Sequence, residues 1–151
     1  MSVALSLKLA AARAIPIFIA ATLANYLWEL AQAPLYQEMG ELRVVLWHCF
    51  RAALGDAVLV LLILAFGAVM LRRWDWYRAP GLSGYVVMAL AGLFVGIAVE
   101  WVGLRLLERW AYTPNMPLIP VLTIGLAPVA QMVLLPPLIF LIVSKWRAVF
   151  N

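Results

Sequence analysis

Charged residues are scarce in this sequence. Asp, Glu, Lys and Arg make up 12% of its 151 residues, compared with about 25% in soluble domains, while hydrophobic residues make up 67% and the mean hydropathy is +1.01. A single cysteine, Cys49, excludes an internal disulfide and a cysteine-based metal cage. No basic stripe interleaved with aromatic residues occurs, which argues against a nucleic-acid partner. These scarcities indicate an integral membrane protein in contact with a lipid bilayer.

Four apolar segments are each long enough to cross about 30 Å of hydrocarbon as a helix. They cover residues 14–33, 52–71, 79–104 and 118–143. The connections between them are too short to fold separately, so residues 1–151 are expected to form one transmembrane domain. We predict an all-α fold, a polytopic membrane protein built as a four-transmembrane-helix bundle.

The fourth segment is the least regular because it contains several prolines. They are Pro120, Pro128, Pro136 and Pro137. A proline inside a helix cannot donate to the carbonyl four residues earlier, which predicts a kinked, proline-rich fourth helix and, for Pro128, a free carbonyl at Ile124. That acceptor and the nearby Gln131 could bind a ligand group, a water or another helix. Alternatively, the prolines only fit the helix to its neighbours.

Basic residues are unequally divided between the two sides of the four segments. One side carries Lys8, Arg13, Arg72, Arg73, Arg78, Lys145 and Arg147, and the other carries Arg43, Arg51, Arg105 and Arg109. Because basic residues concentrate on the cytoplasmic side of a membrane, this imbalance predicts that both termini are cytoplasmic. We expect a multi-pass protein of a bacterial inner (cytoplasmic) membrane.

Three acidic residues, Glu29, Asp56 and Glu100, lie inside the apolar segments. At ~1.5 Å per residue, an alternating topology places all three roughly 6 to 8 Å below the same, outer boundary. A carboxyl group inside a bilayer is costly and usually has a function. We therefore predict a shared polar site, in which Glu29 and Glu100 are the catalytic acid and base.

Other polar residues are placed to complete that site. Asn25, Glu29 and Gln32 recur at helical spacing on one face of the first segment. In the third segment, glycines at similar spacing share the face of Glu100, so another helix can approach closely and Glu100 is expected to point into the bundle. The predicted ligand-binding residues are Asn25, Gln32, His48, Arg51, Asp56, Arg105, Arg109, Tyr112 and Gln131.

Because basic side chains lie near the acids in sequence, the carboxyl groups could be either ionised or protonated. Arg51 precedes Asp56, and Arg105 follows Glu100. A carboxylate close to an arginine is held ionised, whereas an unpaired carboxyl in apolar surroundings takes up a proton. The predicted site is therefore either a salt-bridged network or a proton-holding one.

Each candidate also has a purely structural interpretation. Glu29 and Glu100 could form interhelix ion pairs or hydrogen bonds, Asp56 could cap its helix, and the arginines that follow Glu100 could contact lipid headgroups. His48 and Cys49 fall short of the three or four ligands of a zinc or copper site. We predict neither a metal nor a cofactor.

Two stretches resemble small uncharacterised bacterial four-helix integral membrane proteins. One is residues 25–36 (NYLWELAQAPLY), and the other contains Glu100, Trp101, Gly103, Arg109, Trp110, Tyr112, Met116, Pro117, Pro120, Gly125, Pro128 and Gln131. Over less than a third of the chain, the second stretch also resembles intramembrane carotenoid cyclases and hydratases, although it lacks the paired adjacent acids of the cyclases. The latter resemblance implies acid chemistry on an isoprenoid double bond, carried by Glu100 with Glu29 as its partner.

Three functions from different classes are compatible with these observations. In the first, the protein binds or transforms a lipid-soluble small molecule, such as an isoprenoid, a quinone or a lipid, which Arg105, Arg109 and Tyr112 orient. In the second, it is an accessory or assembly subunit whose glycine face and kinked fourth helix pack against a larger membrane complex. In the third, the acids relay protons or ions in a small transporter, which would need to form a homo-oligomer. We favour the first, and leave open whether the protein is an enzyme.

Overall fold

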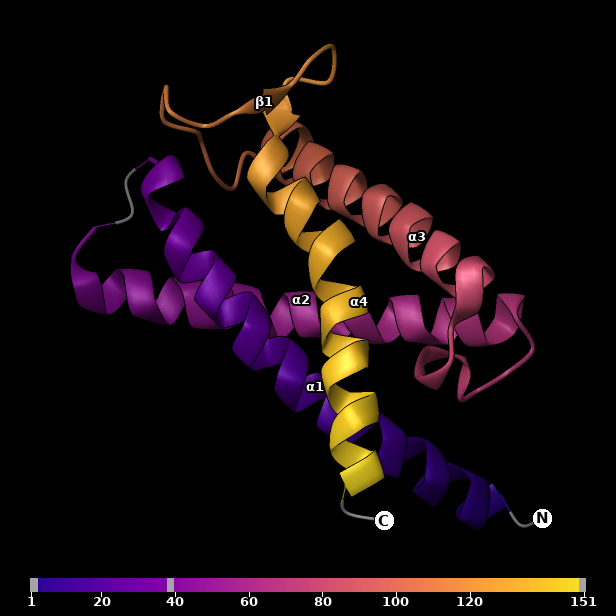
Figure 1. The fold of residues 1–151 in the computed structure, drawn as a ribbon. Helices are drawn as coiled ribbons and strands as arrows, with labels where there is room; N and C mark the ends of the chain where they lie inside the picture. The colour runs from indigo at the N-terminus through magenta and orange to yellow at the C-terminus, as the bar shows by residue number, and fades with distance from the viewer. Residues whose placement is uncertain (1–2, 38–39, 150–151) are drawn as a thin grey trace.

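The computed structural model describes residues 3–37 and 40–149, which are almost entirely helical (Figure 1). The elements are α1 (Val3–Gln32), η1 (Ala33–Leu35), α2 (Leu42–Met70), η2 (Trp76–Arg78), α3 (Gly81–Trp101), η3 (Val102–Leu106), β1 (Leu118–Ile119), β2 (Ile124–Gly125) and α4 (Leu126–Val149). Within these residues, four helices are long and apolar enough to cross a membrane. The all-α prediction is therefore confirmed, as is the expected number of helices that are long and apolar enough to span a membrane.

The first two helices begin earlier than expected. Helix α1 begins at Val3 instead of residue 14, and α2 begins at Leu42 instead of residue 52. The additional part of α2 contains His48 and Arg51, both of which are exposed. A helix can carry such residues at its end because their charged groups reach out to solvent or headgroups. Asp56 consequently lies in the middle of α2, and the prediction that it caps this helix is wrong.

The fourth helix begins later than expected, at Leu126 instead of residue 118. The preceding residues form a hairpin in which β1 pairs antiparallel with β2. Pro128 is thereby the third residue of α4, where a missing N–H costs no intrahelical bond. The prediction that Pro128 frees the carbonyl of Ile124 within a helix is wrong, because Ile124 belongs to β2. Pro136 and Pro137 lie inside α4, and the kink there stays a prediction.

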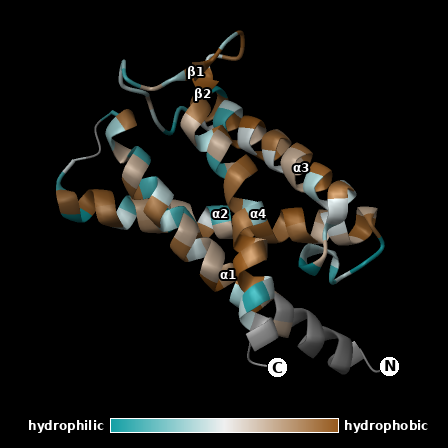
Figure 2. Ribbon diagram, in the orientation of Figure 1, coloured by the Kyte–Doolittle hydropathy of each residue, from teal (hydrophilic) through white to brown (hydrophobic). Residues whose placement is uncertain are grey.

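The four helices pack as two pairs, α1 with α2 and α3 with α4, which meet chiefly through α1 and α4. Helix α1 contacts α2 and α4, while α3 packs mainly on α4, and α2 crosses behind α1 and α4 (Figure 1). Hydrophobic residues run along α2, α3 and α4, and hydrophilic ones gather in the connection between α2 and α3 (Figure 2). Outward-facing side chains such as Leu27 and Phe94 are exposed and apolar, as expected of a surface in contact with lipid.

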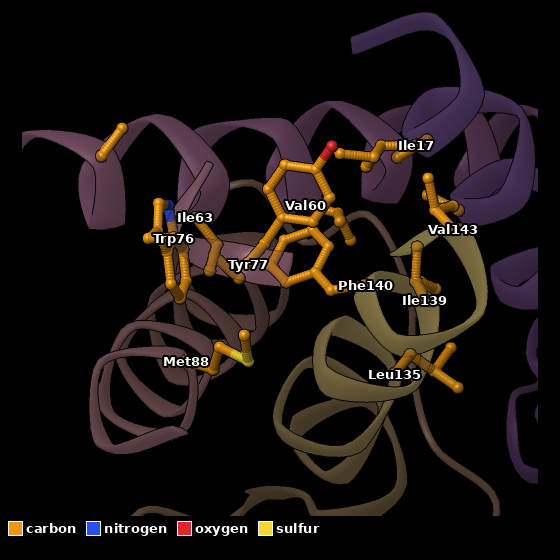
Figure 3. Packing of buried hydrophobic residues seen from close by; sticks show 13 residues of the cluster. Ile17, Val60, Ile63, Trp76, Tyr77, Met88, Leu135, Ile139, Phe140 and Val143 are labelled. Atoms are coloured by element: carbon orange, nitrogen blue, oxygen red, sulfur yellow. The ribbon is translucent and has the colours of Figure 1, made fainter. Parts of the chain in front are cut away.

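The apolar core fills the half of the bundle nearest the connection between α2 and α3 (Figure 3). Trp76 of η2 inserts into it, donates from Nε1 to the carbonyl of Leu64 at 3.0 Å, and packs edge-on against Phe140 at a centroid distance of 5.8 Å. Ile17 of α1 and Ile63 of α2 complete this packing. The buried polar side chains Asn25, Gln32, Glu100 and Gln131 lie outside this apolar core.

Helices α3 and α4 approach each other closely through glycine. A Cβ atom added at Gly92 would lie 2.1 Å from the backbone oxygen of Met132, and one added at Gly96 would lie 3.1 Å from the Cα of Val129. Only residues without a Cβ allow backbones to come so near. The glycine face of α3 is therefore covered by α4 of the same chain.

Candidate functional site

Polar side chains from three helices meet at the end of the bundle opposite the apolar core. We call this group the polar cluster: Asn25, Glu29 and Gln32 of α1, Asp56 of α2 and Gln131 of α4. Three of its members, Asn25, Gln32 and Gln131, are buried, whereas Glu29 and Asp56 are partly exposed. The helical face predicted for the first segment thus points inward, and the two acidic residues are the members of the cluster that keep some exposed surface.

Gln131 is the centre of the hydrogen bonds in the polar cluster. Its Nε2 donates to Asn25 Oδ1 at 2.8 Å and to Asp56 Oδ2 at 2.9 Å. Its Oε1 accepts from Gln32 Nε2 at 3.1 Å. One side chain of α4 therefore joins α1 to α2, and both amide protons and the amide oxygen of Gln131 are satisfied within the protein.

The carboxyl groups of Glu29 and Asp56 face each other within hydrogen-bond reach. Glu29 Oε1 also accepts from Gln32 Nε2 at 2.8 Å. In the described part of the chain, the only ion pair joins Arg73 Nε to Asp75 Oδ1 at 3.6 Å, outside the polar cluster. A carboxylate can only accept a hydrogen bond, so a bond between two carboxyl groups requires one of them to keep its proton. Of the two states left open by the sequence, the geometry favours the proton-holding one.

Glu100 of α3 lies beside the polar cluster, within electrostatic range of Glu29. It is only 4% exposed, so the prediction that it points into the bundle is confirmed. Tyr112 donates its hydroxyl proton to Glu100 Oε2 and accepts the N–H of Gly125 at 2.9 Å. Trp110 Nε1 lies near the same carboxyl without the geometry of a hydrogen bond.

Burial and the neighbouring carboxyl groups both raise the pKa values of Tyr36 and Tyr112 at this end of the bundle. Burial, followed by the hydrogen bond to Glu100, raises the pKa of Tyr112 above its ordinary value. The pKa of Tyr36 is also raised, chiefly by burial and then by the charges of Glu100 and Glu29. Both phenols therefore keep their protons at neutral pH and can act as hydrogen-bond donors.

The connection between α3 and α4 is fixed to the end of α1 by a short antiparallel bridge between Tyr36 and Tyr112. The N–H of Gln37 donates to the carbonyl of Ala111, and the N–H of Thr113 donates to the carbonyl of Leu35, each at 2.9 Å. The rings of Tyr36 and Tyr112 lie 5.7 Å apart. This bridge holds Tyr112 in place above Glu100.

Four of the predicted ligand-binding residues lie neither in the polar cluster nor, like Tyr112, against Glu100. His48 and Arg51 are exposed on the early part of α2, and Arg109 is exposed after η3. Arg105 donates from Nη2 to Thr123 Oγ1 in the turn between β1 and β2. These residues lie outside because α2 is longer than expected and because the π-helical turn η3 directs Arg105 toward the hairpin.

Sequence reasoning missed two groups that the structure places at the site. One is the backbone N–H of Gly125, which was expected within a helix. The other is Tyr36, whose only signal was its place at the end of residues 25–36, two residues after Pro34. Neither backbone pairing nor the role of a loop residue follows from helical periodicity.

Searches against protein-family models, curated proteins and solved structures found no significant match. The resemblances drawn from residues 25–36 and from the segment between Glu100 and Gln131 therefore stay predictions. The interpretation of the site rests on its geometry alone.

Proposed function

We propose that this protein binds, and through Glu29 and Glu100 can protonate or deprotonate, a lipid-soluble small molecule at the polar cluster. The observation that carries the proposal is the carboxyl pair of Glu29 and Asp56, which has no ion-pair partner among the described residues. A protonated carboxyl beside an ionised one offers a hydrogen-bond donor and an acceptor at adjacent positions. Such a pair suits the polar end of an isoprenoid, a quinone or a lipid.

Proton transfer is the chemistry that these residues can supply. A carboxyl group held away from water retains its proton until a base of matching strength is bound, which is the requirement for a general acid. Glu100, with Tyr112 as its hydrogen-bond donor, would act on the same ligand from the side of α3. Arg105 and Arg109 have no part in this proposal, since neither reaches the cluster.

A proton relay is the second candidate, and the contact between Glu29 and Asp56 favours it, because two carboxyl groups that share one proton can pass it on. The subunit alternative has no comparable support. Its expected docking face, the glycines of α3, is occupied by α4.

The proposed setting is a bacterial inner membrane with both termini in the cytoplasm and the polar cluster near the periplasmic side. The excess of basic residues at the opposite side supports this orientation. Labelling of Val121→Cys, at a hairpin position that is 97% exposed, by a membrane-impermeant thiol reagent added to intact spheroplasts would support it, and labelling only after lysis would contradict it.

The test of the proposed function is the set of molecules that copurifies in mild detergent. Organic extracts of the purified protein, analysed by mass spectrometry, should be enriched in one lipid-soluble compound relative to the membrane from which the protein came. Glu29→Gln and Glu100→Gln should lose that enrichment, and Glu108→Gln, which alters an exposed acid outside the cluster, should keep it. Equal extracts from all four proteins would contradict the proposal.

A further inference from the structure

A groove of about 950 Å³ lies between the end of α1 and the start of α2. Its lining residues are Tyr26, Glu41, Arg43, Val44, Leu46, Trp47 and Phe50. Successive residues of a helix point about 100° apart, so Tyr26 faces the groove while Asn25 faces the polar cluster. None of the groove residues belongs to the polar cluster, and most of them are exposed, so the groove is open along its length rather than enclosed.

The groove changes from charged to aromatic along its length. Glu41 and Arg43 lie at the start of the second span, which begins at Leu42. Phe50 lies about 10 Å farther along α2, at ~1.5 Å per residue. There its ring packs against Tyr26 at a centroid distance of 6.0 Å and against Trp47 at 5.8 Å. A charged end at the membrane boundary and an apolar wall beneath it match the shape of a lipid.

The two charges at the boundary are of opposite sign and do not pair with each other. Glu41 and Arg43 are both exposed, and the only ion pair among the described residues is formed by Arg73 and Asp75. An arginine binds a phosphate through two parallel hydrogen bonds, and a carboxylate attracts an ammonium group. A headgroup with a phosphate alone would leave Glu41 beside a like charge.

We propose that this groove binds one phospholipid whose headgroup carries both a phosphate and a primary ammonium group. Arg43 binds the phosphate, Glu41 binds the ammonium, and Trp47 lies at the level where indole rings prefer the membrane interface. An acyl chain lies along Phe50 and Tyr26. This site is separate from the polar cluster, so its test does not depend on the proposed function.

The test is native mass spectrometry of the delipidated protein with an equal mixture of phosphatidylethanolamine and phosphatidylglycerol of identical acyl chains. We expect the wild type to retain phosphatidylethanolamine preferentially. Glu41→Gln should reduce its retention about five- to tenfold, the cost of one interfacial charge contact, and leave phosphatidylglycerol unaffected or better retained. Arg43→Gln should reduce the retention of both lipids.

Two exposed charges at the other end of the bundle provide matched controls. Arg73→Gln and Asp75→Asn remove one base and one acid that lie outside the groove, and both should retain lipid as the wild type does. Thermal unfolding of each variant without added lipid checks that the fold is intact. Equal retention of the two lipids by the wild type, an unchanged preference in Glu41→Gln, or a comparable loss in the control variants would overturn the proposal.

Discussion

Among the described residues, Gln131 is the polar side chain that links α4 to both α1 and α2. It is 1% exposed and contacts Asn25, Gln32 and Asp56. A buried polar group that loses its partner has no water to replace it, whereas a satisfied one fixes the positions of its neighbours. The effect of removing Gln131 should therefore exceed the value of any one of its hydrogen bonds.

Replacement of Gln131 by methionine, which has a similar shape, should lower the free energy of unfolding by about 1 to 3 kcal/mol. Reversible denaturation in mixed detergent micelles measures this change. Leu134→Met, one turn further along α4 at an exposed position, introduces the same residue without removing a hydrogen bond and should be close to neutral. Equal stability of the two variants would show that the amide of Gln131 contributes nothing.

Tyr112 should ionise at a higher pH than an ordinary tyrosine. Its phenolate is disfavoured by burial and by the neighbouring Glu100 carboxyl, so absorbance attributable to the Tyr112 phenolate, obtained by subtracting the Tyr112→Phe titration, should appear only above about pH 10. In Glu100→Gln the same transition should shift to lower pH, because the negative neighbour is gone. An unshifted transition in that variant would mean that Glu100 does not act on Tyr112.

Sequence spacing was sufficient to predict that some of these side chains would meet. Asn25, Glu29 and Gln32 share a helical face, and an intramembrane carboxyl such as Asp56 is expected to face inward. The partners across helices could not be predicted, because a contact between Gln32 and Gln131 depends on how α1 and α4 are rotated about their axes. That rotation is decided by packing, which periodicity does not contain.

At the level of helices, the contact between α3 and α4 depends on residues without a side chain. Gly92 and Gly96 bring the backbone of α3 against Val129 and Met132. In a membrane, where water does not drive helices together, such close packing is a principal source of association. This contact also fixes the depth of Glu100, which lies one further turn along the same face.

A methyl group at Gly92 should separate the two helices. Gly92→Ala places a Cβ atom 2.1 Å from the backbone oxygen of Met132, and a backbone atom cannot move aside, so we expect a loss of at least about 1 to 3 kcal/mol in the free energy of unfolding. Gly55→Ala is the matched control, since a Cβ atom there has no neighbour within 4 Å. Thermal unfolding of both variants in detergent measures the change. The stability of Gly55→Ala should be unchanged or slightly higher.

The number of helices could be predicted from the sequence, but their ends could not. Long apolar runs define spans because a helix is the only simple way to satisfy the backbone in lipid. The start of α2 was missed because Arg51 interrupts the apolar run without interrupting the helix. The start of α4 was missed for the opposite reason, since apolar residues such as Leu118 and Ile119 continue the hydropathy signal through a hairpin.

At the scale of the whole protein, three carboxyl groups lie together and form no ion pair with any described residue. Glu29, Asp56 and Glu100 gather at one end of the bundle, and the arginines near them in sequence are directed elsewhere. Three full negative charges at such a site would be costly in a low-dielectric medium. The protein should therefore carry at least one bound proton at this site at neutral pH.

A hydrophobic carbodiimide should detect that proton. Dicyclohexylcarbodiimide adds the O–H of a protonated carboxyl group across its N=C bond and rearranges to a stable N-acylurea, which peptide mass spectrometry locates. We expect an adduct on Glu29 or Asp56, whereas a water-soluble carbodiimide should modify exposed acids such as Glu108. If neither Glu29 nor Asp56 reacts with the hydrophobic reagent, the pair does not hold a proton that lipid-soluble molecules can reach.

The backbone pairing of Tyr36 with Tyr112 has a mechanical consequence. Backbone hydrogen bonds join the end of α1 to the segment that leads into α4. These two helices therefore cannot separate at this end unless the bridge breaks. A change that separates α1 from α4 beside Glu29 would therefore act on the same segment that positions the Tyr112 hydroxyl against Glu100. The bridge therefore links the surroundings of Glu29 to those of Glu100 through backbone and hydroxyl hydrogen bonds.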